Sequence, residues 1–275
     1  MKICVVGLGL IGASLAKAIK EYTDHFVYGI DIDSITLSKA LNEHTIDKIG
    51  SEKDLNDCDL TIISLYPKAV IDFVKTNRLN FKKGSVVIDT CGVKTEICSE
   101  LPKIAQENGF NFVGAHPMAG KEKPGYDYSE ADLFCRAYMI LTPINVDEKI
   151  VDMLTSFSKE LRFKAVTIST PEEHDRIIAY TSQIPHVLAC AYISDPDATK
   201  HDGFSAGSYK DISRVADINA TLWQELFIEN KSYLTSHIDL LTQKLQEFKN
   251  VIESGNNSKL TDMLKKSKEL KQKNG

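Results

Sequence analysis

Short apolar runs and amphipathic stretches alternate along the first 169 residues of the chain. The apolar runs are rich in Val, Ile and Phe, which favour strands, and the stretches between them suit helices. Strands are expected at residues 2–6, 26–30, 60–65 and 85–89, with further strands at 112–115, 138–142 and 165–168. Helices are expected at residues 10–20, 34–41, 68–76 and 95–108. This alternation predicts parallel βαβ units and an α/β fold with a doubly wound, mostly parallel sheet.

The pattern changes at Thr170. Thr170 and Glu173 have the spacing of a capping box, and Pro171 occupies the first helical position. Beyond this point helical stretches dominate, at residues 180–193, 212–216, 220–253 and 259–272, the last being either a helix or a frayed polar tail. We therefore expect two domains, residues 1–169 with the sheet and residues 170–275 all-α.

Length and charge limit the partners of the chain. Its 275 residues suit two domains better than one core. A net charge of -5 and a pI of about 5.8 give no bulk attraction to nucleic acid or to an anionic membrane surface. The longest apolar runs, such as residues 187–193, are too short to span a bilayer. An anionic small-molecule ligand would need a few well-placed cations.

Six cysteines are spread along the chain without a CxxC pair or a Cys/His run of metal-ligand spacing, so no metal site is expected. This usage fits a reducing compartment better than a disulfide scaffold. No signal peptide is visible, because the first strand starts at Lys2 with no basic segment before it. We expect a cytoplasmic protein.

A glycine motif of the form GxGxxG follows the first expected strand and opens the first helix. Such glycines permit a tight turn, close approach of backbone to a pyrophosphate, and close helix–strand packing. Asp31 ends the second strand, where a carboxylate binds ribose hydroxyls and repels a 2′-phosphate. The pattern predicts a Rossmann-type site for NAD rather than NADP, the alternative being a tight turn alone. The expected cofactor residues of the motif are Gly7, Leu8, Gly9, Leu10, Ile11 and Gly12.

Two neighbouring segments are assigned less specifically. Leu65, Tyr66 and Pro67 follow a strand whose carboxyl end borders the cofactor in doubly wound folds, although an ordinary strand-to-helix turn is equally consistent with them. Asp33 suits a turn or the N-cap of the next helix.

His116 is the candidate for acid–base chemistry. It ends a strand-like run and is flanked by glycines and Pro117. An imidazole titrates near neutral pH, and a dehydrogenase acting on an alcohol needs a base beside the hydroxyl. Considered alone, His116 is slightly better explained as a loop histidine bonded to backbone.

Four segments in this order resemble the prephenate and arogenate dehydrogenases of tyrosine biosynthesis, and the resemblance covers nearly the whole chain. Trp223 and the run from Phe227 to Lys231 also resemble the family pattern. The four segments are the glycine motif, Asp89–Lys94, Ala115–Glu122 and Gly207–Arg214.

The resemblance implies an NAD-dependent oxidative decarboxylation of prephenate to 4-hydroxyphenylpyruvate. His116 then hydrogen-bonds the C4 hydroxyl of the substrate ring, and Arg214 binds a substrate carboxylate with its guanidinium fork. Lys210 lies four residues earlier and would share a helix face with Arg214. Without the resemblance, both cations suit a solvated basic face.

The resemblance also implies roles for several further residues. His186 lines the substrate pocket, or is a partly buried structural histidine. Glu122 lies at the pocket rim, or is a surface carboxylate. His174 and Asp175 match a family His-Asp pair. We expect a structural role for this pair between the domains in the first place, and a catalytic role in the second. Trp223 is near the active site in the family, although a lone tryptophan usually belongs to a core. The helical domain is expected to form a homodimer.

The chain departs from the family at Gly92, where many members carry a serine that bonds the catalytic histidine. Water, Thr90 or another group must replace that bond, or the acid–base tuning differs. The neighbouring Cys91 could carry a reactive thiol, but an inert structural cysteine is the preferred interpretation. Three alternatives remain open: an arogenate dehydrogenase, a β-hydroxyacid dehydrogenase, and a protein that binds NAD as a sensor without turnover.

Overall fold

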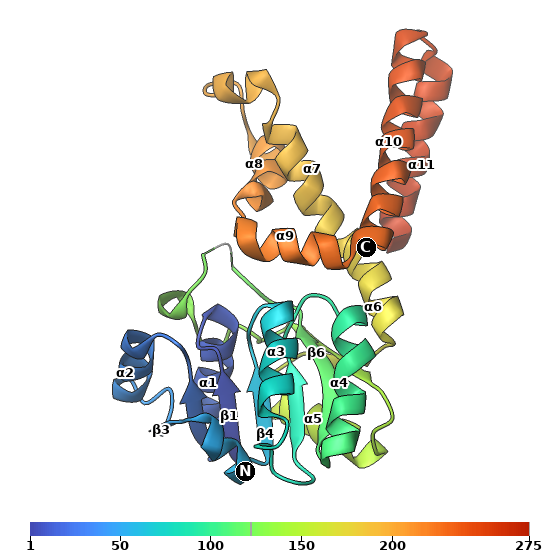
Figure 1. The fold of residues 1–275 in the computed structure, drawn as a ribbon. Helices are drawn as coiled ribbons and strands as arrows, with labels where there is room; N and C mark the ends of the chain where they lie inside the picture. The colour runs from blue at the N-terminus through green and yellow to red at the C-terminus, as the bar shows by residue number, and fades with distance from the viewer. Residues whose placement is uncertain (122, 275) are drawn as a thin grey trace. The chain divides into compact units, whose positions relative to one another are not determined.

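One sheet of eight strands organises the described part of the chain, residues 1–121 and 123–274 of a computed structural model (Figure 1). Its order is β3-β2-β1-β4-β5-β6-β7-β8, and every neighbouring pair is parallel except β6 with β7. The α/β fold with a mostly parallel, doubly wound sheet is confirmed. The strands are β1 (Lys2–Val6), β2 (Phe26–Ile30), β3 (Lys48–Ile49), β4 (Leu60–Ile63), β5 (Val86–Asp89), β6 (Asn111–Pro117), β7 (Tyr138–Pro143) and β8 (Ala165–Ile168).

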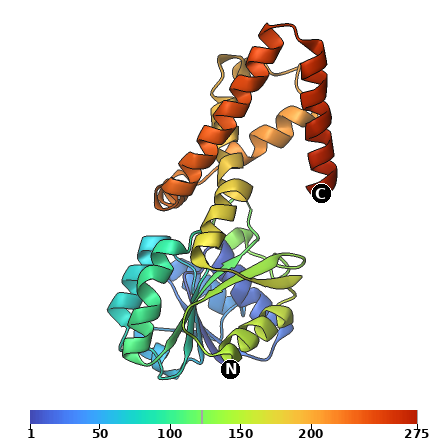
Figure 2. The same ribbon diagram turned by 90° about the vertical axis from the view of Figure 1, so that its right-hand side faces the viewer.

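Helices cover both faces of the sheet (Figure 2). Successive side chains of a strand point to opposite faces, so Ile3 and Val5 of β1 enter one core while Cys4 and Val6 enter the other. The first core is shared with α1 and α5, and the second with α3 and α4. The helices of this part are α1 (Leu10–Tyr22), α2 (Ser34–Asn42), α3 (Pro67–Asn77), α4 (Thr95–Asn108) and α5 (Glu148–Glu160), with short 3-10 turns η1 (Glu52–Asp57) and η2 (Tyr126–Tyr128).

Helix α5 was not among the expected elements, although its sequence contains the signal. Asp147 caps it by accepting a hydrogen bond from the Lys149 N–H, and Ile150, Leu154 and Phe157 have helical spacing toward the first core. Asp33, expected as a turn or cap residue, is the N-cap of α2 and accepts from the N–H groups of Ile35 and Thr36.

The chain after β8 is helical, as expected. Its elements are α6 (Pro171–Ile178), the π-turn η3 (Ala179–Gln183), α7 (Ile184–Ile193), η4 (Pro196–Lys200), α8 (Gly207–Ser213), η5 (Arg214–Ala216), α9 (Ala220–Glu229), α10 (Lys231–Glu253) and α11 (Asn257–Asn274). Thr170 caps α6 through the Glu173 N–H.

Two expectations for this region need correction. A single helix over residues 220–253 is wrong, because α9 ends at Glu229 and Asn230 leaves the helical conformation. The Asn230 side chain instead donates hydrogen bonds to the Asp175 carbonyl and the Gln183 side chain. The helix expected over residues 180–193 begins as a π-turn, in which the Ile184 N–H bonds the Ala179 carbonyl five residues back.

The described residues divide into two compact units, one ending at Asn230 and one starting at Lys231. The second consists of α10 and α11, joined by a turn at Gly255 with φ +63°. The expected domain boundary after residue 169 stays a prediction. No helix among the described residues combines the length and apolar composition that crossing a bilayer requires.

Candidate active site

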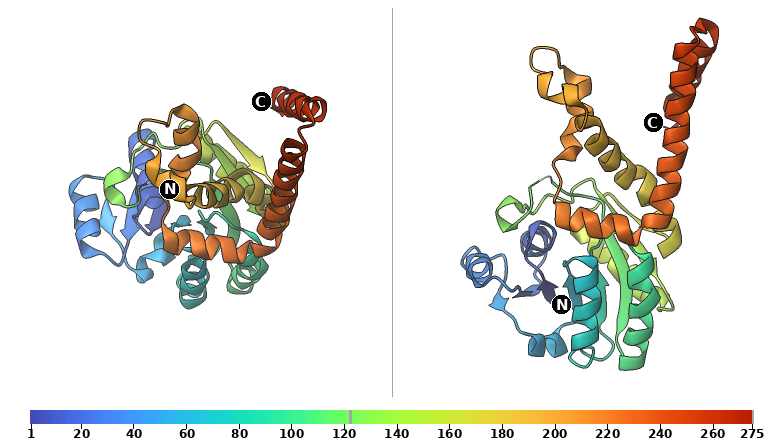
Figure 3. Two further views of the ribbon diagram at one scale, coloured as in Figure 1. Left: turned by 90° about the horizontal axis from the view of Figure 1, so that it is seen from above. Right: turned by 45° about the horizontal axis from the view of Figure 1, so that its top comes forward.

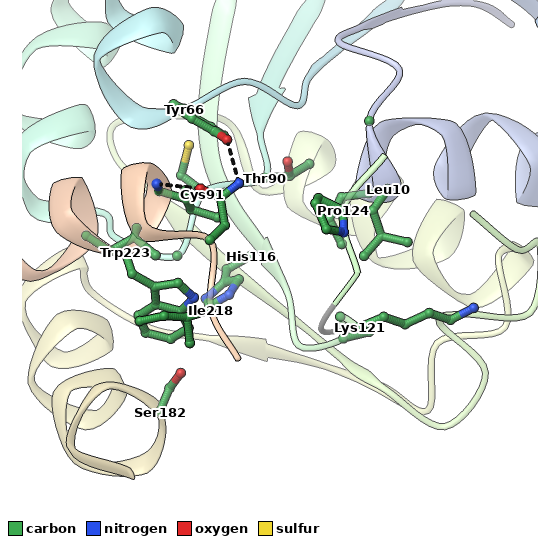
Figure 4. Close-up of a pocket in the computed structure, with 18 of the residues that line it drawn as sticks. Leu10, Tyr66, Thr90, Cys91, His116, Lys121, Pro124, Ser182, Ile218 and Trp223 are labelled. Carbon is green, nitrogen blue, oxygen red and sulfur yellow. Dashed lines mark hydrogen bonds between the residues drawn. The ribbon is translucent and has the colours of Figure 1, made fainter. Parts of the chain in front are cut away.

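A cavity of about 680 Å³ opens where the carboxyl ends of β1, β4, β5 and β6 meet the helices after β8. All its lining residues belong to the first unit. Ligands bind at this edge of doubly wound sheets. Figure 4 shows His116, Ile218 and Trp223 gathered on one side of the cavity, with Leu10, Pro124 and Lys121 on the other.

The glycine motif forms a loop that only small residues permit. Gly7 has φ +85°, and a Cβ there would lie 2.5 Å from the Ser64 carbonyl oxygen. A Cβ on Gly12 would lie 1.9 Å from the Gly7 carbonyl oxygen. By contrast, a Cβ on Gly9 would meet no protein atom within 4 Å, and Gly9 lines the cavity. The open space over Gly9, at the start of α1, fits the close approach of a pyrophosphate to backbone N–H groups.

Asp31 holds this loop in place. Its carboxylate accepts hydrogen bonds from the Leu8 N–H at 2.7 Å and from the Asp33 N–H at 2.9 Å. The side chain is half-buried, which leaves it able to accept further bonds from a ribose. The residues present therefore fit a dinucleotide that lacks a 2′-phosphate.

The loop after β4 connects the cofactor side of the cavity to α9. Leu65, Tyr66 and Pro67 all line the cavity. The Tyr66 hydroxyl accepts a hydrogen bond from the Asn219 side chain at 3.0 Å (Figure 4). Figure 3 shows α9 passing the start of α3, where Glu225 accepts the Lys68 backbone N–H at 2.6 Å.

His116 stands near the end of β6, paired with Ile140 of β7, and its ring lines the cavity. Its Nδ1 lies 2.9 Å from Nε2 of His174 on α6. Burial lowers the pKa of His116 well below its ordinary value of 6.5, and the charges of His174 and Lys94 lower it further. His116 is thus a neutral imidazole at physiological pH, the form that accepts a proton.

Charged groups behind His116 are buried and paired. Lys94 forms an ion pair with Asp89, and neither side chain is exposed. Asp89 also accepts the N–H groups of Cys91 and Ala115. Asp175 accepts a bond at 2.7 Å from the ring of His174, and the N–H groups of Lys94 and Thr95 at the start of α4. Buried charges need such partners. Together these bonds hold β5, β6, α4 and α6 in place around His116.

The substrate-side candidates lie on the same side of the cavity as His116, where Figure 4 shows Trp223. The His186 and Trp223 rings stack with centroids 3.7 Å apart. Nδ1 of His186 lies 2.8 Å from the Ser182 carbonyl oxygen, to which it donates. Burial lowers the pKa of His186, and the nearby Arg214 charge contributes in the same direction. Arg214 lines the cavity from the η5 turn.

Two family models match the chain. The model described as "Prephenate dehydrogenase, nucleotide-binding domain" matches residues 15–168, and "Prephenate dehydrogenase, dimerization domain" matches residues 170–266. The chain belongs to the prephenate dehydrogenase family. Because the chain belongs to this family, the alternative of a β-hydroxyacid dehydrogenase is dropped.

Similar proteins agree over the full length. A cyclohexadienyl dehydrogenase from Zymomonas mobilis is 28% identical over 98% of this chain and 94% of its own. The structure of Aquifex aeolicus prephenate dehydrogenase with hydroxyphenyl propionate and NAD+ is 27% identical, with a TM-score of 0.89 over 99% of this chain and 98% of that one. Synechocystis arogenate dehydrogenase is 26% identical, with a TM-score of 0.85 over 99% of both chains.

The cavity brings together most of the predicted site residues of this family member. His116, Arg214 and His186 line it, as do Leu65–Pro67 and three residues of the glycine motif, Gly9, Leu10 and Ile11. Gly7, Leu8, Gly12 and Asp31 do not line it and shape the loop from behind. Lys210 is exposed and lies outside the lining, and Glu122 lies outside the described residues.

Several lining residues were not predicted as site residues from the sequence. Trp223 was named but left unassigned, and Ser182, Gln183 and Asn219 were not proposed. Their sequence signal is weak, because helical positions that face a cavity look like core positions. Cys91 is a buried thiol that donates to the Leu65 carbonyl, and burial raises its pKa well above 9.0, which supports the expectation that it is unreactive.

Proposed function

We propose that this chain is an NAD-dependent prephenate dehydrogenase, which converts prephenate to 4-hydroxyphenylpyruvate and CO2. The observation that carries this proposal is the placement of a neutral, partly buried imidazole, His116, in one cavity with Arg214 and the glycine loop. A base, a carboxylate-binding cation and a dinucleotide loop are the groups that oxidation of an anionic alcohol requires.

The nucleotide side of the site would hold NAD through residues of the glycine motif and Asp31. When bound, the nicotinamide supplies the two-electron acceptor of the reaction. Asp31 would bind the adenosine ribose and disfavour a 2′-phosphate, because its carboxylate is already fixed by two N–H groups on the loop side. The chain's own contribution here is a preformed backbone cradle.

On the substrate side, Arg214 would bind one carboxylate, and His186, stacked on Trp223, would line the pocket for the ring. His116 accepts the proton of the C4 hydroxyl, and loss of the ring carboxylate as CO2 makes the ring aromatic. The protein therefore has to position the ring and hold one proton, since aromatisation supplies much of the driving force.

Prephenate is preferred over arogenate in this proposal because of the charges that line the cavity. Arogenate carries an ammonium group that needs a carboxylate. Among the described lining residues the carboxylate is Asp217, whereas Lys121 and Arg214 are cationic. This balance suits a dianion without an ammonium group better.

We also propose that the chain acts as a homodimer. The family model matching residues 170–266 describes a dimerization domain. Exposed Leu240, Leu245 and Ile252 on α10 supply apolar surface for a second copy. Light scattering during size-exclusion chromatography should give a mass twice that of the 30.6 kDa chain.

The deciding experiment measures NADH formation by absorbance with prephenate or arogenate, each with NAD or NADP. Turnover of prephenate with NAD is expected to exceed the other three combinations. Faster turnover of arogenate would assign that substrate instead. Binding of NAD with no turnover of either substrate would contradict an enzymatic role and support the sensor alternative.

A further inference from the structure

A chain of three side chains extends from the cavity into α6. Nδ1 of His116 lies 2.9 Å from Nε2 of His174, and Nδ1 of His174 lies 2.7 Å from the Asp175 carboxylate. His174 and Asp175 are buried, at 2% and 1% exposure, so water does not compete for these bonds. This connection joins β6 to α6 directly behind the proposed base.

The hydrogen-bond partners determine which ring nitrogens of His116 and His174 carry a proton. Asp175 already accepts the N–H groups of Lys94 and Thr95, and its pKa is below its ordinary value even though burial opposes this, since bonds from His174 and Thr95 favour the carboxylate. A carboxylate only accepts, so Nδ1 of His174 carries the hydrogen. Its Nε2 then holds a lone pair and accepts from Nδ1–H of His116. The basic nitrogen of His116 is therefore Nε2.

Gly92 borders the His116 ring but has no side chain that could bond it. A Cβ on Gly92 would lie 3.9 Å from Cε1 of His116 and 3.5 Å from a methyl of Leu226, so Gly92 borders the ring without touching it through a polar atom. The Thr90 hydroxyl donates to Ser64 at 3.2 Å. In the described structure, the ring nitrogen of His116 bonds to His174 instead.

Surrounding contacts keep His174 and Asp175 fixed. The Asn230 side chain donates to the Asp175 carbonyl at 2.9 Å and to Gln183 at 2.8 Å, and Gln183 donates to the Leu226 carbonyl. The charged groups facing the two imidazoles are Asp175 on α6 and the buried Lys94–Asp89 pair between β5 and α4. Because the Asp89 carboxylate is paired with Lys94, Asp175 is the carboxylate that bonds the His174 ring.

We infer that His174 and Asp175 are positioning residues that fix the tautomer of His116, with Nε2 unprotonated toward the substrate. When His116 takes the substrate proton at Nε2, its Nδ1 proton moves toward His174, and Asp175 stays a carboxylate that balances the charge. The catalytic meaning of this arrangement rests on the proposed function, whereas the tautomer itself does not.

Nitrogen NMR of protein labelled with ¹⁵N-histidine tests the tautomer without substrate or cofactor, because protonated and unprotonated ring nitrogens have distinct shifts. His116 is assigned by its loss in His116→Asn. We expect an unprotonated Nε2 in the wild type. His174→Phe removes the acceptor and should shift His116 toward the Nε2–H form, whereas His174→Gln keeps an acceptor oxygen and should preserve the wild-type form.

Kinetics of the same variants provide the second readout. His174→Phe should lower kcat by roughly 10²-fold with little change in the Kd for NAD, since a general base in the wrong tautomer cannot take the proton. His174→Gln should recover most of that loss. His201→Phe is the matched control, because His201 is exposed and stacks on Tyr209 away from the cavity.

An Nε2-protonated His116 in the wild type, or an unchanged tautomer in His174→Phe, would overturn the inference. So would a Gln variant as impaired as the Phe variant, because both would then report packing alone. A wild type with the expected tautomer but no NADH formation would refute the proposed function and leave the assignment of the tautomer standing.

Discussion

The rings of His186 and Trp223 stack at 3.7 Å between centroids with an interplanar angle of 30°, in the lining of the cavity that also holds the proposed base. Trp223 is the single tryptophan of the chain, so its fluorescence reports this wall alone. A protonated imidazole quenches a stacked indole more strongly than a neutral one does.

The stack predicts a pH-dependent fluorescence signal. Burial lowers the pKa of His186 below 6.5, so emission should fall only as the pH drops through that lowered pKa. His186→Gln should abolish the step, and His201→Gln should keep it. A step that survives in His186→Gln would show that another group quenches Trp223.

The acid limb of the pH–rate profile should reflect His116. The active form is the neutral imidazole, and burial places its pKa well below 6.5. We therefore expect kcat/KM with prephenate to stay constant as the pH is lowered past 6.5. It should decrease only when the pH reaches the lowered pKa of His116. His116→Asn should lower kcat by about 10²–10⁴-fold and leave NAD binding unchanged. Equal losses in turnover and NAD binding would make His116 structural.

Arg214 and Lys210 should differ in substrate binding. Arg214→Ala should raise the KM for prephenate by an amount equivalent to roughly 1.5–3 kcal/mol, the contribution of hydrogen bonds to a charged group. Lys210→Ala should change KM little, because Lys210, unlike Arg214, lies outside the cavity lining. Equal effects of the two substitutions would return Lys210 to the site.

Two glycines of the motif should separate cofactor binding from folding. A Cβ on Gly9 meets no protein atom within 4 Å, so Gly9→Ala should fold normally yet weaken NAD binding by roughly tenfold or more, since it fills the space of the pyrophosphate. A Cβ on Gly12 would clash with the Gly7 carbonyl, so Gly12→Ala should lower stability by about 1–3 kcal/mol or more. Calorimetry for NAD and thermal melts of the apoprotein distinguish them.

Glu229 should make stability fall as pH rises toward neutrality. Burial, with the Glu225 charge, raises its pKa from 4.5 to about 7, and its Oε2 has no hydrogen-bond partner among the described residues. Between these values the folded state binds more protons than the unfolded state, so the free energy of unfolding decreases with rising pH. Glu229→Gln should flatten this slope in thermal melts, and an unchanged slope would exclude Glu229 as its source.

The sequence allowed prediction of those parts of the site that are local. The glycine loop, Asp31 and the end of β6 are each specified by neighbouring residues and by the order of parallel strands. The bond between His116 and His174 joins residues 58 positions apart on different elements, so no spacing rule reveals it. The His-Asp pair was noticed, but its contact with the base came from the fold.

Breaks in helices were the hardest features to predict. Lys210 and Arg214 would align on a continuous helix, yet α8 ends at Ser213 and Arg214 begins a 3-10 turn with a tighter repeat. Asn230 interrupts the expected long helix because its side chain finds partners in Asp175 and Gln183. The break at Asn230 therefore depends on tertiary contacts that helix propensity does not contain.

The π-turn at Ala179–Gln183 sets the rotational phase of the helix that follows it. In a regular α-helix, Ile178 and His186 would be separated by about 80° around the axis, because each residue advances by about 100°. One additional residue in the turn reduces that separation to about 20°. Ile178, Ser182 and His186, which all line the cavity, therefore lie in nearly one stripe. The π-turn is thus itself a determinant of the site: the same residues wound as a regular α-helix would place His186 about 80° from Ile178 and turn it away from this stripe, with every side chain still present.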